Sequence, residues 1–260
     1  MDSFSRLVEI MARLRAPGGC PWDQVQTHES LRPYLIEESA EVLQAIEKRD
    51  SANLCEELGD LLLQSVFHAQ IAQDAGDFTL DDVLNGISDK LVRRHPHVFG
   101  DVKAEDAAQV VTNWEAIKKA EKAERGEKTD SVLGEIPAEL PALSQALKIS
   151  KKAAKVGFEW PDEGGVLEKL REETREIEDA LQNESTERVA EEIGDLLFTA
   201  VNLARWRGIN PEIALRDVNR KFIARFEKME EAAQRDGRKL ETLSGQEWEE
   251  LWNEAKQAQN

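Results

Sequence analysis

Residues 37–60 have the sequence EESAEVLQAIEKRDSANLCEELGD, and residues 172–195 have the sequence EETREIEDALQNESTERVAEEIGD. Both stretches contain Glu-Glu-x-x-Glu followed by Glu-Glu-x-x-Asp, and the offset between them is the same at both ends (172 − 37 = 135 and 195 − 60 = 135). Positions i, i+3 and i+4 of a helix share a face, so each motif predicts a ladder of carboxylates on one helix. The repetition predicts two copies of one helical domain.

The second motif of each pair leads into an apolar segment, LLLQSVF at 61–67 and LLFTAV at 196–201. Such helices are expected to be largely buried, and a buried carboxylate needs a partner cation or a metal ion. A hard divalent cation such as Mg²⁺ suits a set of oxygen ligands. The alternative is that these glutamates form a solvated face of the helix. This alternative applies above all to Glu-Glu-x-x-Glu, the first motif of each pair. Gly59 and Gly194 hold equivalent places, and we expect a neighbouring helix or a ligand to approach closely there.

Composition excludes several classes of protein. The formal net charge of the 260 residues is −18, which argues against direct binding to nucleic acid or to an anionic membrane. No apolar stretch approaches the about 20 residues that span a bilayer. The two cysteines, Cys20 and Cys55, lack metal-binding spacing and fit reduced residues. We therefore expect a soluble, cytoplasmic protein.

Apolar residues recur at three and four along most of the chain, which predicts helices throughout, about four in each half. Turn residues separate them: the first helix is expected to end near Arg15, and Ser51 and Thr79 are the predicted N-caps of later helices. Residues 121–130, EKAERGEKTD, are highly charged and lack an apolar stripe. The predicted organisation is therefore a first domain at 1–118, a charged linker at 119–140 and a second domain at 141–260.

Basic residues accompany both acidic pairs. Lys90-x-x-x-Arg94 in the first half matches Lys221-x-x-x-Arg225 in the second, and this spacing places both cations on one helical face. Alone the motif fits a solvated basic stripe, but beside carboxylate ladders it indicates a site for a metal ion and phosphate. Around the acids the halves differ, since the second has Lys169 and Arg188 where the first has Tyr34 and Asn53. Two tryptophans near the ends of the halves, Trp114 and Trp252, fit either a core position or stacking on a base.

Together these motifs resemble the MazG family of nucleoside triphosphate pyrophosphohydrolases in its two-domain form, over nearly the whole chain. The resemblance rests on the paired acidic motifs and on GCPWD at 19–23, THESL at 27–31, RRHPHVFG at 93–100 and VGFEW at 156–160. It implies an all-α fold of two tandem helical bundles, a homodimer, and dependence on Mg²⁺, for which Mn²⁺ can substitute. It also implies cleavage of NTPs or dNTPs to a monophosphate and pyrophosphate.

The resemblance further implies that activity resides mainly in the second half, and residue roles follow by matching its motifs. Metal ligands would be Glu173, Glu176, Glu192 and Asp195, with a second set, whose part in catalysis stays open, at Glu38, Glu41, Glu57 and Asp60. Nucleotide contacts would be Lys169, Arg188, Lys221, Arg225 and Trp252. Tyr34 and Asn53 put catalysis by the first half in doubt.

The mechanism that we expect is metal-assisted hydrolysis of a phosphoanhydride. Glu172 and Glu191 are candidates to take the proton of the attacking water, and Lys221 and Arg225 would stabilise the leaving pyrophosphate. The alternatives are a non-catalytic, nucleotide-binding or regulatory helical dimer and a purely structural bundle. The sequence leaves open the base and sugar preference, and also whether the role is house-cleaning or control of a nucleotide pool.

Overall fold

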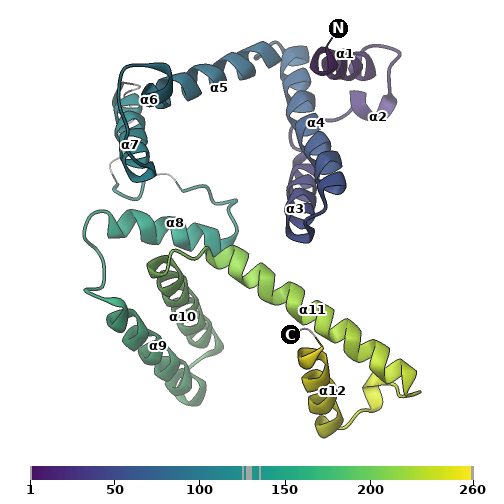
Figure 1. Ribbon diagram of the computed structural model, residues 1–260, viewed down its shortest axis with the longest axis vertical. Coiled ribbons are helices and arrows are strands. Elements are labelled where there is room, and N and C mark those ends of the chain that lie inside the picture. Colours follow the sequence, from purple (N-terminus) through teal and green to yellow (C-terminus); the bar gives the residue numbers. More distant parts are fainter. Residues whose placement is uncertain (1, 125, 127–130, 135, 259–260) are drawn as a thin grey trace. The chain divides into compact units, whose positions relative to one another are not determined.

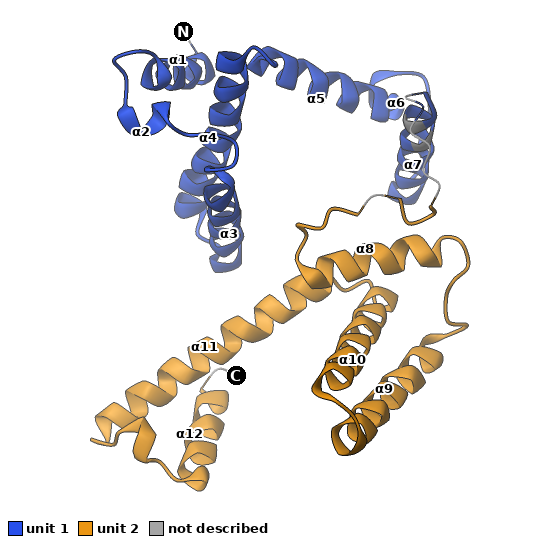
Figure 2. Cartoon of the chain, turned by 180° about the vertical axis from the view of Figure 1, so that it is seen from behind, with its two compact units in different colours: residues 1–127 blue, residues 128–260 orange. Residues whose placement is uncertain are grey.

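Two helical hairpins, one in each half of the chain, organise the fold of this computed structural model (Figure 1). The structure describes residues 2–124, 126, 131–134 and 136–258, and all regular secondary structure within these ranges is helical. The chain divides into two compact units, Met1–Glu127 and Lys128–Asn260 (Figure 2). The fold is therefore an all-α tandem repeat, as the sequence predicts.

In the first unit the hairpin consists of α3 (Arg32–Lys48) and α4 (Ser51–Ala75). Two residues join the helices: Arg49 adopts a left-handed conformation with φ 55°, and Asp50 accepts hydrogen bonds from the backbone amides of Ala52 and Asn53. The predicted N-cap Ser51 is thus wrong by one residue, because the Asp50 carboxylate satisfies the free amides instead. The remaining helices are α1 (Ser3–Arg15), α2 (Pro21–Gln24), α5 (Leu80–Arg94), α6 (Pro96–Phe99) and α7 (Ala107–Glu124).

The core of the first unit lies where α1 and α5 pack against α4. Met11, Leu31, Val66 and Phe67 are almost fully buried there. Thr79 caps α5 as predicted, and its capping box is closed by Asp82. This packing leaves the other end of the α3–α4 hairpin, which bears the acidic motifs, outside the core.

The second unit repeats the hairpin with α9 (Glu163–Asn183) and α10 (Thr186–Trp206). Their bounds at the turn match those of α3 and α4 shifted by 135 residues (183 − 48 and 186 − 51). The Ser185 hydroxyl accepts from the amide of Arg188 and caps α10. The other helices are α8 (Ala142–Ala154), α11 (Pro211–Arg235), the 3₁₀ turn η1 (Leu240–Thr242) and α12 (Gly245–Gln257).

In the second unit α10 packs against both α9 and α8. A separate buried cluster lies between α11 and α12 and consists of Met229, Ala233, Leu251 and Ala255. α11 leads away from α10 to reach α12, so the two ends of this unit are separated (Figure 1).

The division between the units at residues 127 and 128 falls inside the segment 119–140 predicted as a linker. α7 continues to Glu124, so the start of that segment is helical. Residues 125, 127–130 and 135 of the segment lie outside the described residues. Among the helices that the structure describes, none is long and apolar enough to cross a membrane.

Candidate metal and nucleotide site

The α9–α10 hairpin brings three predicted metal ligands together. Carboxylate oxygens of Glu173, Glu192 and Asp195 lie within 4.8 Å of one another. Glu173 and Glu192 are each only 3% exposed, while Asp195 faces solvent. Glu176, the fourth predicted ligand, lies one turn beyond Glu173 on α9 and is not part of this close group. Burial raises the pKa of Glu176, the charges of Glu173 and Glu192 add to the increase, and Lys169 opposes it.

Two cations contact the buried acids. Lys169 Nζ lies 2.7 Å from Glu172 Oε1 and 2.8 Å from Glu173 Oε1. On α10, Arg188 pairs with Glu192 and lies 2.8 Å from Glu191. Hydrogen bonds to these carboxylates raise the pKa of Lys169, led by the bond to Glu172. The bond to Glu191 is the leading cause of the raised pKa of Arg188. Both side chains therefore stay charged at neutral pH.

The residues of this site fit a divalent metal ion. Glu173 Oε2 is buried and has no hydrogen-bond partner among the residues that the structure describes. A buried carboxylate oxygen without a partner is costly, and a metal ion beside Glu192 and Asp195 would remove that cost. Carboxylate oxygens are also the ligands that Mg²⁺ and Mn²⁺ prefer.

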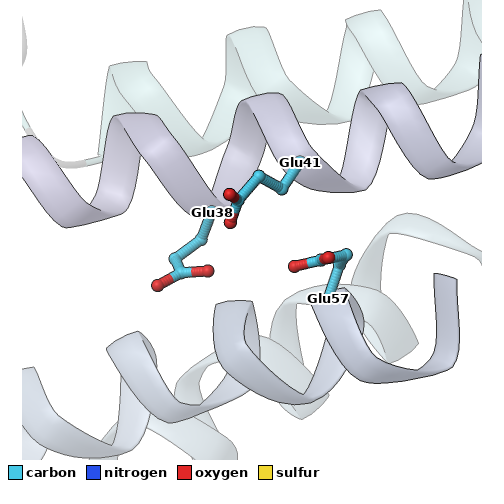
Figure 3. A group of neighbouring side chains, drawn as sticks. All are labelled: Glu38, Glu41 and Glu57. Atoms are coloured by element: carbon cyan, nitrogen blue, oxygen red, sulfur yellow. The ribbon is translucent and has the colours of Figure 1, made fainter. Parts of the chain in front are cut away.

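The first unit contains a similar group of carboxylates, but its helices α3 and α4 place no cation next to that group. Oxygens of Glu38, Glu41 and Glu57 lie within 4.8 Å of one another across α3 and α4 (Figure 3). The fourth predicted ligand, Asp60, is not part of this close group. Burial is the leading cause of the raised pKa of both Glu38 and Glu57, and the charges of neighbouring acids add to it.

The positions that supply cations in the second unit differ in the first. Tyr34 lies where Lys169 would be, and its ring meets the edge of Trp22 at 5.9 Å between centroids. Asn53 lies where Arg188 would be. The first group of acids can therefore hold a cation, but these two positions offer it no positive charge for phosphate.

Lys221 and Arg225 lie on α11, the helix that leads away from α10. The Arg225 guanidinium lies 5.7 Å from the ring centroid of Trp252 on α12, and Lys256 Nζ lies at the same distance. A hollow of about 380 Å³ adjoins them, lined by Phe222, Phe226, Met229, Trp248 and Trp252 among others. The structure thus brings Arg225 and Trp252 together, but on the α11–α12 side of the unit.

The first unit has the same stack of arginine on tryptophan. Arg94 lies 5.3 Å from the ring centroid of Trp114, and Lys118 lies 5.6 Å from it. Here Glu121 receives hydrogen bonds from both Arg93 and Arg94, which lower its pKa to about 2. The arginine that matches Arg225 is therefore engaged by a carboxylate of its own unit.

Sequence reasoning missed the contacts that join the segment before α9 to α10 and α8. Glu159 pairs with Arg205 and accepts hydrogen bonds from Trp206 Nε1 at 3.0 Å and from the amide of Trp160 at 2.9 Å. Arg205 also donates to Ser150 on α8 at 2.6 Å. Glu159 belongs to the VGFEW motif at 156–160, but Arg205 and Trp206, which contact Glu159, are distant from it in sequence. No local signal could therefore have revealed these contacts.

Comparison with known proteins identifies the family of the chain. The family model described as "MazG nucleotide pyrophosphohydrolase domain" matches twice, at residues 26–99 and 163–230. The chain is 50% identical to a protein of Thermotoga maritima named nucleoside triphosphate pyrophosphohydrolase/pyrophosphatase MazG, over 97% of this chain and 95% of that protein. It is 45% identical to the nucleoside triphosphate pyrophosphohydrolase of Escherichia coli K12, over 98% of both chains. An uncharacterized Bacillus subtilis protein, YabN, is 49% identical over 98% of this chain but only 52% of its own length.

Both family matches include the acidic hairpins, and the first two relatives align over nearly their whole length. The chain therefore belongs to the MazG family and is an enzyme, a nucleotide pyrophosphohydrolase.

Proposed function

We propose that this chain hydrolyses NTPs or dNTPs between the α and β phosphates and releases a nucleoside monophosphate and pyrophosphate, with Mg²⁺ as the cofactor. The observation that carries the proposal is the group of Glu173, Glu192 and Asp195 with Lys169 and Arg188 beside it. Acids for a metal ion and cations for phosphate oxygens are the two parts that phosphoryl chemistry requires. The names of the relatives from Thermotoga maritima and Escherichia coli support the same substrate class.

The second unit supplies the groups for this reaction. Glu173, Glu192 and Asp195 would hold the metal ion, with Glu176 one turn away as a further ligand. When bound, the ion would neutralise phosphate charge and lower the pKa of an attacking water. Glu172 and Glu191 are more exposed than the buried ligands and remain the candidates to take the proton of that water.

The cations would act on the triphosphate. Lys169 and Arg188 lie beside the metal ligands and would bind phosphate oxygens there, with the arginine fork suited to two oxygens at once. Lys221 and Arg225 would stabilise the leaving pyrophosphate, and Trp252 would contact the nucleotide. These three residues lie on α11 and α12, so we propose that a second copy of the chain supplies them.

Exposed apolar side chains support the homodimer. Leu197 and Phe198 on α10 and Phe222 and Ile223 on α11 are all exposed, although helices of this pattern normally bury such residues. Burial against a second copy would cover them.

A second candidate function applies to the first unit, for which we propose metal or nucleotide binding without turnover. Glu38, Glu41 and Glu57 can hold a cation, but Tyr34 and Asn53 replace the two cations of the second unit. Exchanging the acids of one unit at a time in the full chain tests both proposals. Loss of pyrophosphate release only with the second unit's acids supports them, whereas loss only with the first unit's acids would reverse the assignment.

The physiological setting also belongs to this proposal. A cytoplasmic location fits Cys20 and Cys55, which are both free thiols. House-cleaning of nucleotides and control of a nucleotide pool both follow from the same reaction. The net charge of −18 supports the expectation that neither nucleic acid nor a membrane is a direct partner.

A further inference from the structure

Lys169 and Arg188 share two contacts with the acids of their helices. Each reaches an exposed carboxylate three residues on, Glu172 or Glu191, and a buried carboxylate four residues on, Glu173 or Glu192. Their third partners differ: Lys169 lies 4.0 Å from Glu176, and Arg188 lies 3.4 Å from Glu184. The arrangement is thus repeated on α9 and α10, and each half of it joins a cation to a predicted metal ligand.

These contacts compete with a metal ion. Lys169 occupies Glu173 Oε1, while Oε2 of the same carboxylate is buried without a hydrogen-bond partner among the described residues. Arg188 pairs with Glu192, whose oxygen lies within 4.8 Å of those of Glu173 and Asp195. A divalent ion coordinated by these oxygens would repel two positive charges at the distance of a direct contact. Metal binding therefore favours moving both cations away from Glu173 and Glu192.

The side chains have room to move. Lys169 is 33% exposed and Arg188 is 48% exposed, and both have long, flexible stems. Glu172 and Glu191, which also contact the two cations, are themselves more than half exposed. They can keep the cations beside the site after the buried carboxylates have been given up to the metal.

We propose that Lys169 and Arg188 are internal counterions of the metal-free site, which the metal ion displaces from Glu173 and Glu192 and so releases to bind the phosphate oxygens of the nucleotide. The part of this inference that concerns phosphate rests on the proposed function. It follows that metal and nucleotide bind with positive coupling, because the ion pairs of Lys169 and Arg188 with the buried carboxylates oppose the binding of both ligands, and either ligand weakens these ion pairs for the other. The first unit, with Tyr34 and Asn53 at these positions, lacks this device.

Nucleotide-free Mn²⁺ binding to the full chain tests the proposal, measured by the loss of the free Mn²⁺ signal in electron paramagnetic resonance. Glu38→Gln and Glu57→Gln serve as the common background, so that the second unit's site is observed. Lys169→Met should bind Mn²⁺ about tenfold more tightly, which corresponds to about 1.4 kcal/mol. Arg188→Met should give a smaller gain, about threefold, because the more exposed ion pair is better screened.

Two controls separate direct competition from other effects. Arg175→Met removes a charge from the exposed face of the same helix, where its Nε donates to the Arg171 carbonyl, and should change Mn²⁺ affinity less than about twofold. Lys169→Arg keeps the cation and should stay near the parent affinity. Circular dichroism verifies the fold, and Arg188→Met is an independent arm if Lys169→Met does not fold.

Unchanged or weaker Mn²⁺ binding in the folded Lys169→Met and Arg188→Met proteins would overturn the inference. An equal gain in Arg175→Met would also overturn it, since net charge alone would then explain the effect. Turnover of NTPs by the unaltered chain is measured in parallel. Tighter Mn²⁺ binding without any turnover would refute the proposed function and leave the counterion role, whereas turnover with unchanged Mn²⁺ binding would refute only the counterion role.

Discussion

Replacing Glu173 by glutamine should remove metal binding and turnover while leaving the fold intact. The amide keeps the shape of the side chain but removes its charge from the group that contains Glu192 and Asp195, whose oxygens lie within 4.8 Å. Two unit charges about 4 Å apart interact by roughly 4 kcal/mol at an effective dielectric of about 20, so a carboxylate and a divalent ion interact by roughly 8 kcal/mol before hydration is counted. If hydration offsets half of this, a loss of ~4 kcal/mol remains, which is roughly a thousandfold in metal affinity.

The same replacement has opposing effects on stability. It removes the contact with Lys169, but it also relieves repulsion from two neighbouring carboxylates. The free energy of unfolding should therefore change by no more than about 1–2 kcal/mol. Calorimetric titration with Mg²⁺, release of nucleoside monophosphate and thermal melting are measured on the same preparations. Glu178→Gln, on the exposed face of α9, is the matched control and should behave like the parent. Retained metal binding and turnover in Glu173→Gln would refute the assignment, as would equal losses in Glu178→Gln.

Three further outcomes follow from the structure. Arg225→Ala chains and Glu173→Gln chains should each be inactive alone. If a second copy supplies Arg225, mixing the two should restore part of the pyrophosphate release, whereas mixed dimers that stay inactive would contradict a contribution from the second copy. The pKa of Glu121 is lowered from 4.5 to about 2, so the stabilising effect of this carboxylate is complete above pH 4.5 and is lost as the pH falls towards 2. Hydrogen exchange of α5 and α7 should show this acid dependence, and Glu121→Gln should abolish the dependence. The raised pKa values of Glu38 and Glu57 mean that the first unit loses stability as the pH rises from 4.5 through those values. Mg²⁺ bound between these carboxylates at neutral pH should therefore slow the hydrogen exchange of α3 and α4. If no Mg²⁺ concentration protects these helices, the result argues against a cation at Glu38 and Glu57.

Much of the fold follows from local patterns in the sequence. The offset of 135 residues between the acidic motifs reappears in the bounds of the two hairpins, because each hairpin carries the same carboxylate ladders and has a capping residue, Asp50 or Ser185, directly before its second helix. The capping box at Thr79 was also predictable, since it depends on residues three apart. The cap of α4 was not, because Asp50 and Ser51 are both good caps and only the backbone path selects one.

The expectation of close packing at two glycines was wrong for neighbouring helices. A Cβ atom at Gly59 or at Gly194 would meet nothing within 4 Å. Periodicity identifies the face on which a residue lies but does not show whether another helix of the same chain covers that face. The other expectation, that a ligand approaches these positions closely, stays a prediction.

The candidate site was predictable in its parts but not in its grouping. Spacing identified the acids, and three of the four predicted ligands in each unit form a close group. The pairing of Lys169 and Arg188 with those acids follows from spacing of i, i+3 and i+4. The position of Arg225 beside α12 depends on the direction in which α11 leaves α10, and no local pattern encodes that direction.

The most direct test of the central claim is the release of products from a panel of NTPs and dNTPs with Mg²⁺, in three forms of the full chain: unaltered, with Glu173→Gln and Glu192→Gln, and with Glu38→Gln and Glu57→Gln. The account predicts equal amounts of nucleoside monophosphate and pyrophosphate from the first and third forms and none from the second. Absence of product from the unaltered chain, or product from the chain that lacks Glu173 and Glu192, would contradict it.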